Sequence, residues 1–356
     1  MFTARAAIWL CLAVAAVNMN WGVTSIIRDI ADQLLFGMLE GATVVWDLET
    51  APEFADGSPG CARGKFWVEG CFFEPFSSCQ DEFQAGLLPE PRFLLPVRFP
   101  KVWNDTDWFL TSSQALWNEL VSSNAVTSDV CGDASATHLD VGPASFRHAQ
   151  RLAMFRSILL RVAFRPNRRL RQKTRQVEIQ SNVKKLAQQG PLVVVHIRRT
   201  DKKAEFAHRG LTLPPQYRTV PGHSAASVAM FGPLLWFLEH VASPMAGYFF
   251  MTDDPRLFKE EIYDALSSVF RNLFVGRASS TASACSFTSQ LDEAILEKGH
   301  THWPNRSSQY LQVLAESYAA AGSAQYIVGS GSSGVTQFIA QLLGGRFRMD
   351  PNLLGL

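Results

Sequence analysis

A cluster of charged residues, Arg198-Arg199-Thr200-Asp201-Lys202, comes directly after an apolar run in the second half of the chain. The run extends from Leu192 to Ile197, is interrupted only by His196, and follows a Gly-Pro pair, so it predicts a strand buried on both faces. Ligands of open parallel sheets lie beyond the carboxyl ends of the strands, where cations are suited to an anionic ligand. Because an isolated Arg-Arg pair is more often a solvated loop, a binding site here needs support from other segments.

A glycine- and serine-rich segment, Gly329-Ser330-Gly331-Ser332-Ser333-Gly334, supplies such support. It lies between a predicted strand, Tyr326 to Val328, and a predicted helix, Val335 to Leu343. Glycines let the backbone approach a ligand closely, serine hydroxyls add hydrogen-bond donors, and the start of a helix presents N–H groups at the positive end of its dipole. The segment therefore predicts a phosphate site, with a plain tight turn as the alternative.

The same glycines match the dinucleotide-binding pattern GxGxxG, with Asp350 at a separation that suits a ribose contact. This alternative would indicate a nicotinamide-dependent oxidoreductase. The pattern normally opens its domain, however, and only 22 residues follow Gly334, too few for the remaining βαβ units. A phosphate-binding turn late in the domain is the better interpretation.

Carboxylates follow a second apolar run. Asp253-Asp254 comes after a predicted strand, Gly247 to Thr252, and before Pro255, so the pair suits the cap of the next helix better than a metal pair. Glu205 and His208, a few residues beyond the Arg cluster, are the nearest groups able to act as a general base. Each would be an ordinary loop residue if it stood alone.

Alternating strands and helices from residue 190 onward predict an α/β fold with a doubly wound parallel sheet. Between the segments above, the apolar patterns predict a helix over Ser224 to Val241, a helix from Pro255 to Val269, a strand over Asn272 to Val275, a polar loop over Ala278 to Ser289 and a helix over Gln309 to Ala320.

The first half predicts a helix from Thr24 to Glu40 and a strand from Ala42 to Leu48, then an ordered loop over 51–100 whose aromatic residues suit core packing. A further helix is expected over Phe146 to Val162. The basic run Phe164 to Arg175 has an apolar stripe beneath its charges, which favours a solvated helix face over a polybasic patch for membrane or nucleic acid. At 356 residues the chain suits two domains, which we expect at 20–189 and 190–356.

The apolar run from Ala6 to Val17, within residues 1–19, has two interpretations: the core of a signal peptide or membrane anchor, or the first buried strand. Six cysteines without metal-site spacing, three of them in the 51–100 loop, suit disulfides in the secretory pathway. Sequons at Asn104 and Asn305 agree with that compartment. A formal net charge of +1 gives no overall attraction to nucleic acid.

Taken in order, three motifs, His196-Ile-Arg-Arg-Thr-Asp-Lys202, Met251-Thr-Asp-Asp-Pro255 and Ser332-Ser333, resemble the α-1,6-fucosyltransferase family of N-glycan core and chito-oligosaccharide enzymes. Asn20-Trp-Gly22 and Phe164-Arg-Pro166 are similar to earlier parts of the family pattern. The resemblance implies a GT-B-like, two-domain fold whose carboxyl-terminal Rossmann-like domain binds GDP-fucose. It implies inverting, metal-independent transfer of L-fucose, α-1,6 to GlcNAc of a glycan or glycoprotein acceptor, in the Golgi lumen without a cofactor.

The resemblance also implies roles for individual residues. Arg198 would hold the pyrophosphate with Ser333, His196 would contact the guanosine end, and Ser332 would also belong to the donor site. Glu205, aligned through a one-residue gap, would be the base that deprotonates the acceptor hydroxyl. The family's aspartate before the last strand corresponds to Glu316 with a gap, or to Ser317 without one. The remaining residues would organise the cleft: Arg199, Asp201, Lys202, Asp253 and Asp254.

The sequence also allows a second interpretation, a catalytically inactive glycan-binding protein of the same fold. The altered position at Glu316 and the unusual loop glycines support it. Binding of GDP without transfer to any acceptor would distinguish that protein from a fucosyltransferase.

Overall fold

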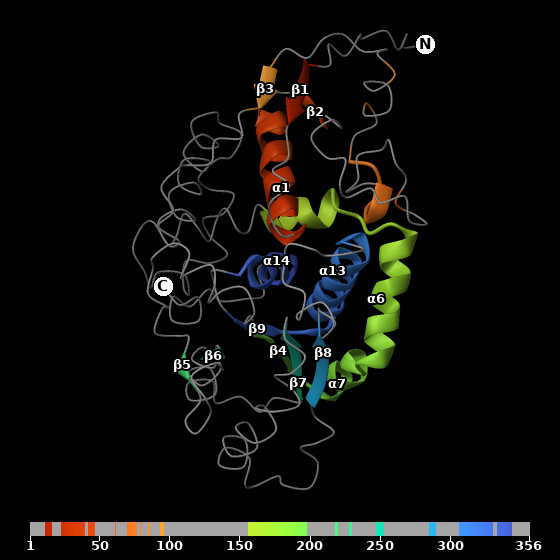
Figure 1. The fold of residues 1–356 in the computed structure, drawn as a ribbon, viewed down its shortest axis with the longest axis vertical. Helices are drawn as coiled ribbons and strands as arrows, with labels where there is room; N and C mark the ends of the chain where they lie inside the picture. The colour runs from red at the N-terminus through yellow and green to blue at the C-terminus, as the bar shows by residue number, and fades with distance from the viewer. Residues whose placement is uncertain are drawn as a thin grey trace, which may run out of the picture. The chain divides into compact units, whose positions relative to one another are not determined.

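The computed structural model describes residues 11–15, 23–39, 42–46, 61, 70–76, 79, 85, 93–95, 156–197, 218–219, 228–229, 247–252, 285–289, 306–329 and 333–343. The chain divides into two compact units, Met1–Asn167 and Arg168–Leu356. This division lies before α6 (Arg168–Gln180), whereas the sequence put the boundary at 189/190. The reason is that α6 and α7 (Val183–Gln189) both pack on α13 (Arg306–Ser323) of the second unit (Figure 1).

The second unit is built on a parallel sheet of β4 (Leu192–Ile197), β7 (Gly247–Thr252), β8 (Cys285–Ser289) and β9 (Tyr326–Gly329). The spatial order is β8-β7-β4-β9, and each neighbouring pair is parallel (Figure 1). Along the chain, β7 and then β8 are added on one side of β4, whereas β9 is added on its other side. The direction in which strands are added therefore reverses between β4 and β9. The predicted parallel sheet is confirmed, and the reversal is the arrangement of a doubly wound sheet.

Burial explains why these runs are strands. Leu192 to His196 in β4 and all six residues of β7 are buried, as expected for central strands covered on both faces. At its start, β4 is joined to the residue before β9, because Gln325 N–H donates to the Leu192 carbonyl at 3.0 Å and Leu192 N–H donates to Gln325 Oε1 at 2.7 Å.

Two described strands lie where the sequence predicted something else. β8 occupies the end of the predicted polar loop 278–289, since its alternating Ser, Phe and Thr side chains suit an edge strand beside β7. β6 (Val228–Ala229) lies within the predicted helix 224–241 and pairs antiparallel with β5 (Arg218–Thr219). The sequence Gly232-Pro233, which follows β6, disfavours a continuous helix here. The predicted helix from Pro255 and the strand 272–275 lie outside the described residues.

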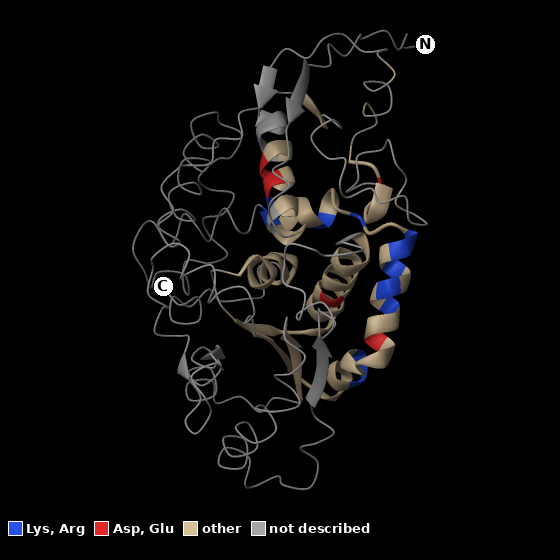
Figure 2. Ribbon diagram, in the orientation of Figure 1, with Lys and Arg blue, Asp and Glu red and all other residues tan. Residues whose placement is uncertain are grey.

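The basic run is a helix, as predicted. α6 buries Leu170 and Val177, and its exposed side is cationic (Figure 2). The apolar stripe was expected to continue beyond the basic run through Val177 and Ile179. Ile179 is instead 68% exposed, because the helix ends at Gln180 and the chain turns through Asn182 at φ 53° into α7. Among the helices that the structure describes, none combines the length and the apolar composition that a membrane crossing requires.

The first unit contains a three-stranded parallel sheet of β1 (Cys11–Ala15), β2 (Ala42–Trp46) and β3 (Phe93–Leu95), in the order β2-β1-β3. α1 (Val23–Leu39) packs on β2 and agrees with the predicted helix. β1 lies in the apolar run for which the sequence allowed a strand or a signal segment, and in this structure it is a strand.

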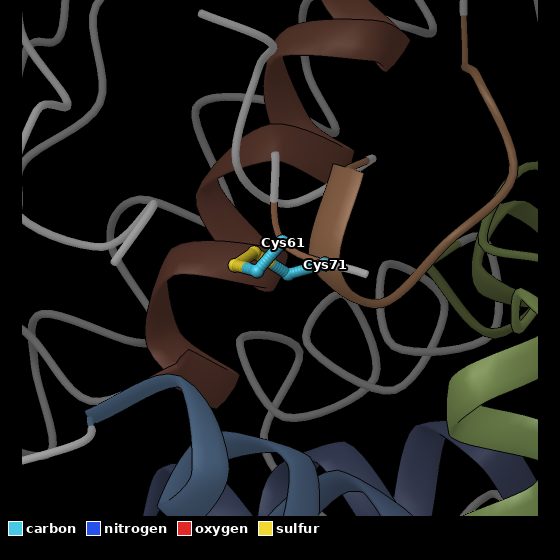
Figure 3. The surroundings of a disulfide bond; sticks show 2 residues. All are labelled: Cys61 and Cys71. Atoms are coloured by element: carbon cyan, nitrogen blue, oxygen red, sulfur yellow. A yellow bond between two sulfur atoms is a disulfide. The ribbon is translucent and has the colours of Figure 1, made fainter. Parts of the chain in front are cut away.

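Aromatic side chains from the 51–100 region pack in the core of the first unit. Phe73 meets Phe164 edge to face with ring centroids 5.3 Å apart, and Phe76 lies 4.5 Å from the same ring. Backbone hydrogen bonds join this region to residues 165–167, including Asn167 N–H to the Phe72 carbonyl at 2.9 Å. Cys61 and Cys71 form a disulfide (Figure 3), in agreement with an ordered loop.

A buried charged cluster lies between α1 and the helix at 156–162. Arg156 forms a bidentate ion pair with Asp32, with both N···O distances 2.6 Å. Asp29 lies 4.0 Å from Arg28, and both residues are buried. Burial, reinforced by the negative charge of Asp32 and opposed by the two arginines, raises the pKa of Asp29 to about 7. Burial also lowers the pKa of Arg28.

The raised pKa of Asp29 predicts a pH-dependent stability. Because the folded-state pKa of about 7 lies above the unfolded value of 3.8, this group favours folding most below about pH 4, and the contribution is lost as the pH rises through 7. As the pH rises from 5 to 8, the wild type should therefore lose about 2 to 3 kcal/mol of unfolding free energy relative to Asp29→Asn, which has no titrating carboxyl at this position. Urea unfolding at both pH values measures this difference. A wild-type-minus-variant difference that stays constant with pH would contradict the raised pKa.

Candidate functional site

The reversal of strand order between β4 and β9 locates the candidate site. Crevices of open α/β sheets form at the carboxyl ends of the strands where the order reverses, because the two crossover connections leave in opposite directions. In the register of this sheet His196, near the end of β4, is the partner of Gly329, the last residue of β9. Both of the segments that the sequence marked out therefore reach the same edge of the sheet.

His196 is held at this edge by hydroxyl groups of the next helix. Its Nδ1 lies 2.8 Å from Thr336 Oγ1 and 3.5 Å from Ser333 Oγ. All three side chains are buried. Since a hydroxyl can donate or accept, the pair of oxygens fixes the orientation of the imidazole ring.

Ser333 directly precedes α14 (Gly334–Leu343), and its carbonyl accepts a hydrogen bond from Gln337 N–H of that helix at 3.0 Å. The Ser333 hydroxyl lies toward His196, and the first turn of α14 carries no acidic residue. A helix start of this kind presents backbone N–H groups and the positive end of the helix dipole. Such a combination favours an anionic ligand, and phosphate groups suit it well.

Gly329 is required by the closeness of β9, β4 and α14. A Cβ atom at this position would lie 2.8 Å from Thr336 Oγ1 and 3.0 Å from the His196 carbonyl oxygen. Neither the ring-bonded hydroxyl nor the strand backbone can move away without disturbing the contacts of His196. The glycine thus allows β9 to end against the hydroxyls that orient the imidazole.

Two residues of α13 were candidates for one nucleoside contact, and both are buried. Glu316 Oε1 accepts a hydrogen bond from Gln312 Nε2 at 2.6 Å, whereas Ser317 Oγ donates to the Val313 carbonyl of its own helix at 2.8 Å. Next to them, burial raises the pKa of Tyr318, whose ring packs edge to face on Phe338 of α14. Glu316 is the one of the two that offers a carboxylate.

The structure brings two of the predicted site residues together, His196 and Ser333. The sequence analysis did not predict Thr336. It could have been found from its position three residues after Ser333, because a side chain at the third position of a helix lies close to the residue that precedes the helix. Among the described residues no group of three or more His, Cys, Asp or Glu is arranged to hold a metal ion. The other predicted site residues lie outside the described residues: Arg198, Arg199, Asp201, Lys202, Glu205, Asp253, Asp254 and Ser332.

Thr336→Val is expected to remove the short contact to His196 while keeping the shape of the side chain. Loss of this 2.8 Å contact from a buried imidazole should cost about 1 to 2 kcal/mol of unfolding free energy. Thr336→Ser, which keeps the hydroxyl, should recover most of it. Chemical denaturation of the three proteins measures the effect, and equal stability of the valine and serine variants would show that the hydroxyl does not hold the ring.

No family model and no curated protein matches the chain. Among solved structures, it is similar to NodZ alpha-1,6-fucosyltransferase soaked with GDP-fucose, at 12% identity and a TM-score of 0.44, covering 94% of this chain and 92% of that one. NodZ co-crystallised with GDP is similar at 13% identity and a TM-score of 0.42, with 93% and 91% covered. A variant of FUT1 from Arabidopsis thaliana in complex with GDP is similar at 12% identity and a TM-score of 0.37, with 94% and 69% covered. The activity of this chain must therefore be inferred from its own residues.

Proposed function

We propose that this protein is an inverting, metal-independent fucosyltransferase that moves L-fucose from GDP-fucose to a glycan acceptor, with an α-1,6 linkage to a GlcNAc of an N-glycan or chito-oligosaccharide. The single observation that carries the proposal is the meeting of His196 with Ser333 and Thr336 between β4 and β9. Two motifs 137 residues apart in the sequence thereby share one phosphate-favouring edge.

Strand register adds support from the third motif. Ile197 and Thr252 are partners at the ends of β4 and β7. Arg198 follows the first of them in the sequence and Asp253 follows the second. The cationic and acidic motifs of the fucosyltransferase resemblance thus both continue from neighbouring strand ends, on the side of the sheet where α14 begins.

The proposed reaction is a single displacement. The acceptor hydroxyl oxygen forms a bond to C1 of fucose while the bond between C1 and the β-phosphate oxygen breaks and its electron pair leaves with GDP. The hydroxyl proton goes to the carboxylate of Glu205. Arg198 and the start of α14 would stabilise the charge that develops on the departing diphosphate, while Arg199, Asp201 and Lys202 organise the cleft around them.

A nicotinamide-dependent oxidoreductase is less well supported by the strand order. The dinucleotide fingerprint follows the first strand of its sheet, whereas the glycine-rich segment here follows β9, which comes after β4, β7 and β8 in the chain. A silent glycan-binding protein of the same fold is the second candidate. Its support is Glu316, a longer side chain than the family aspartate and one already bonded to Gln312.

Transfer of radiolabelled fucose from GDP-fucose to a panel of glycans, with mass spectrometry of the product, tests the proposal. We expect transfer without added divalent metal and in the presence of a chelator, and a thermal shift with GDP but not with NADH. Binding of GDP with no transfer to any acceptor would favour the silent protein. A shift with NADH alone would overturn both.

An oxidising compartment is part of the proposal. The Cys61–Cys71 disulfide supports it, because disulfides persist in secreted proteins and in the secretory lumen and are rare in the cytosol. We therefore expect the enzyme to work in the secretory pathway, in the Golgi lumen, where nucleotide-sugar donors meet glycoprotein acceptors.

A further inference from the structure

The exposed side of α6 is an unusual surface for a chain with a net charge of +1. The helix carries four arginines and one lysine, and its only acid, Glu178, is bonded to Lys184 of α7 at 2.6 Å. Cations of this density normally alternate with acids on a solvated helix face, because neighbouring like charges repel. Figure 2 shows Lys and Arg along much of the helix.

Three of the arginines form a row, which we call the arginine face: Arg168, Arg171 and Arg175. They recur at i, i+3 and i+7, which keeps them on one side of a helix, and all three are exposed. The buried residues of α6, Leu170 and Val177, lie on the opposite side, where α6 packs on α13. At 1.5 Å per residue the row spans roughly 10 Å along the helix axis.

The composition of this side points to a particular kind of partner. Guanidinium groups bind sulfate and carboxylate through paired N–H donors, which lysine cannot do. Gln172, also exposed, lies next to the row and can hydrogen-bond to sugar hydroxyls. A straight row of forked cations with an amide beside it fits an extended chain that carries both anionic groups and hydroxyls.

A membrane surface fits less well. Attraction to anionic lipids depends on charge and does not distinguish arginine from lysine. Stable binding of a helix to a membrane also needs an apolar face to insert, and the apolar face of α6 is covered by α13. Duplex nucleic acid is disfavoured by the proposed lumenal compartment, in which polyanions are glycans.

We propose that the arginine face of α6 binds a linear anionic polysaccharide, one that carries sulfate or carboxylate groups along its chain. The surface would hold an anionic glycan or a glycoprotein bearing one, in addition to the residues that bind the sugar donor. Binding of the polysaccharide does not require fucose transfer, so the two proposals can fail independently.

The test uses the full chain and a heparin hexasaccharide as the probe, with titration calorimetry at low and at physiological salt. R168Q/R175Q is expected to weaken hexasaccharide binding about tenfold or more, because each variant position loses one charge-assisted contact. The matched control K173Q/K185Q removes the same charge at positions away from the row, one on α6 and one on α7, and should change the affinity by less than about threefold. GDP affinity and thermal stability should be unchanged in both, which excludes misfolding.

Three results would overturn the proposal. One is equal weakening by the two double variants, which would mean that only net charge attracts the probe. The second is full hexasaccharide affinity in R168K/R175K, since the guanidinium fork would then be irrelevant. The third is binding to anionic phospholipid vesicles or to a DNA duplex that is as tight as binding to the hexasaccharide.

Discussion

Replacing Arg198 by alanine is expected to lower kcat for fucose transfer about 100- to 1000-fold, with little change in stability. The departing diphosphate of GDP gains negative charge as the bond to fucose breaks, and a preorganised cation stabilises that charge far more in the transition state than in bound substrate. Arg198 follows the end of β4 directly, at the edge where His196 and Ser333 meet. Radiolabelled transfer assays over a range of GDP-fucose concentrations separate the effect on kcat from that on KM.

Lys185→Ala is the control for this prediction, since it removes an exposed cation from α7 at a position with no proposed role. Its turnover should be that of the wild type. Circular dichroism and thermal unfolding establish that both variants are folded. Turnover of Arg198→Ala within a few-fold of the wild type would exclude the role of Arg198 at the pyrophosphate.

Gly329→Ala is expected to destabilise the second unit by about 1 to 3 kcal/mol and to weaken GDP binding at the same time. The added methyl group would lie 2.8 Å from Thr336 Oγ1 and 3.0 Å from the His196 carbonyl oxygen, so either α14 or the end of β4 must shift. Both elements belong to the proposed GDP site, which is why a stability defect and a binding defect should appear together. Urea denaturation and calorimetric titration with GDP measure the two effects.

Gly322→Ala is the control: it makes the same glycine-to-alanine change, but it is expected to stabilise the protein rather than destabilise it. Gly322 lies in α13 with nothing within 4 Å of an added Cβ, so alanine should raise stability by up to about 1 kcal/mol through its better helix propensity. If Gly329→Ala were as stable as the wild type or more stable, as expected for Gly322→Ala, the close approach of β9, β4 and α14 would be wrong.

The sequence was most informative where burial dominates. β4 and β7 were predicted because central strands of a parallel sheet need unbroken apolar runs, and β9 from its short apolar run before the glycine-rich segment. The α13 and α14 helices were visible from their apolar periodicity. β8 was missed because a Ser- and Thr-rich strand has the composition of a loop until the position of β7 beside it is known. Strand order could not be deduced either, since it depends on which distant runs pair.

The candidate site shows the same limit at the level of single residues. Ser333 was predicted from the glycine- and serine-rich segment, and His196 from the family resemblance of the motif that it begins. Thr336 could not be predicted as a ring partner, because its hydroxyl meets the imidazole only after β4 and β9 pair and α14 folds back beside them. Contacts across 140 residues are a product of topology, and local patterns do not encode them.

The pairing of β4 with β9 is fastened at both ends, by Gln325 at the start of β4 and by His196 with Thr336 at its finish. Two strands pinned in this way cannot slide or hinge against each other without breaking several hydrogen bonds together. The amides of β4 should accordingly rank among the slowest to exchange with deuterated solvent. If the protein binds GDP-fucose as proposed, this strand pair would remain a rigid part of the donor site throughout the reaction cycle.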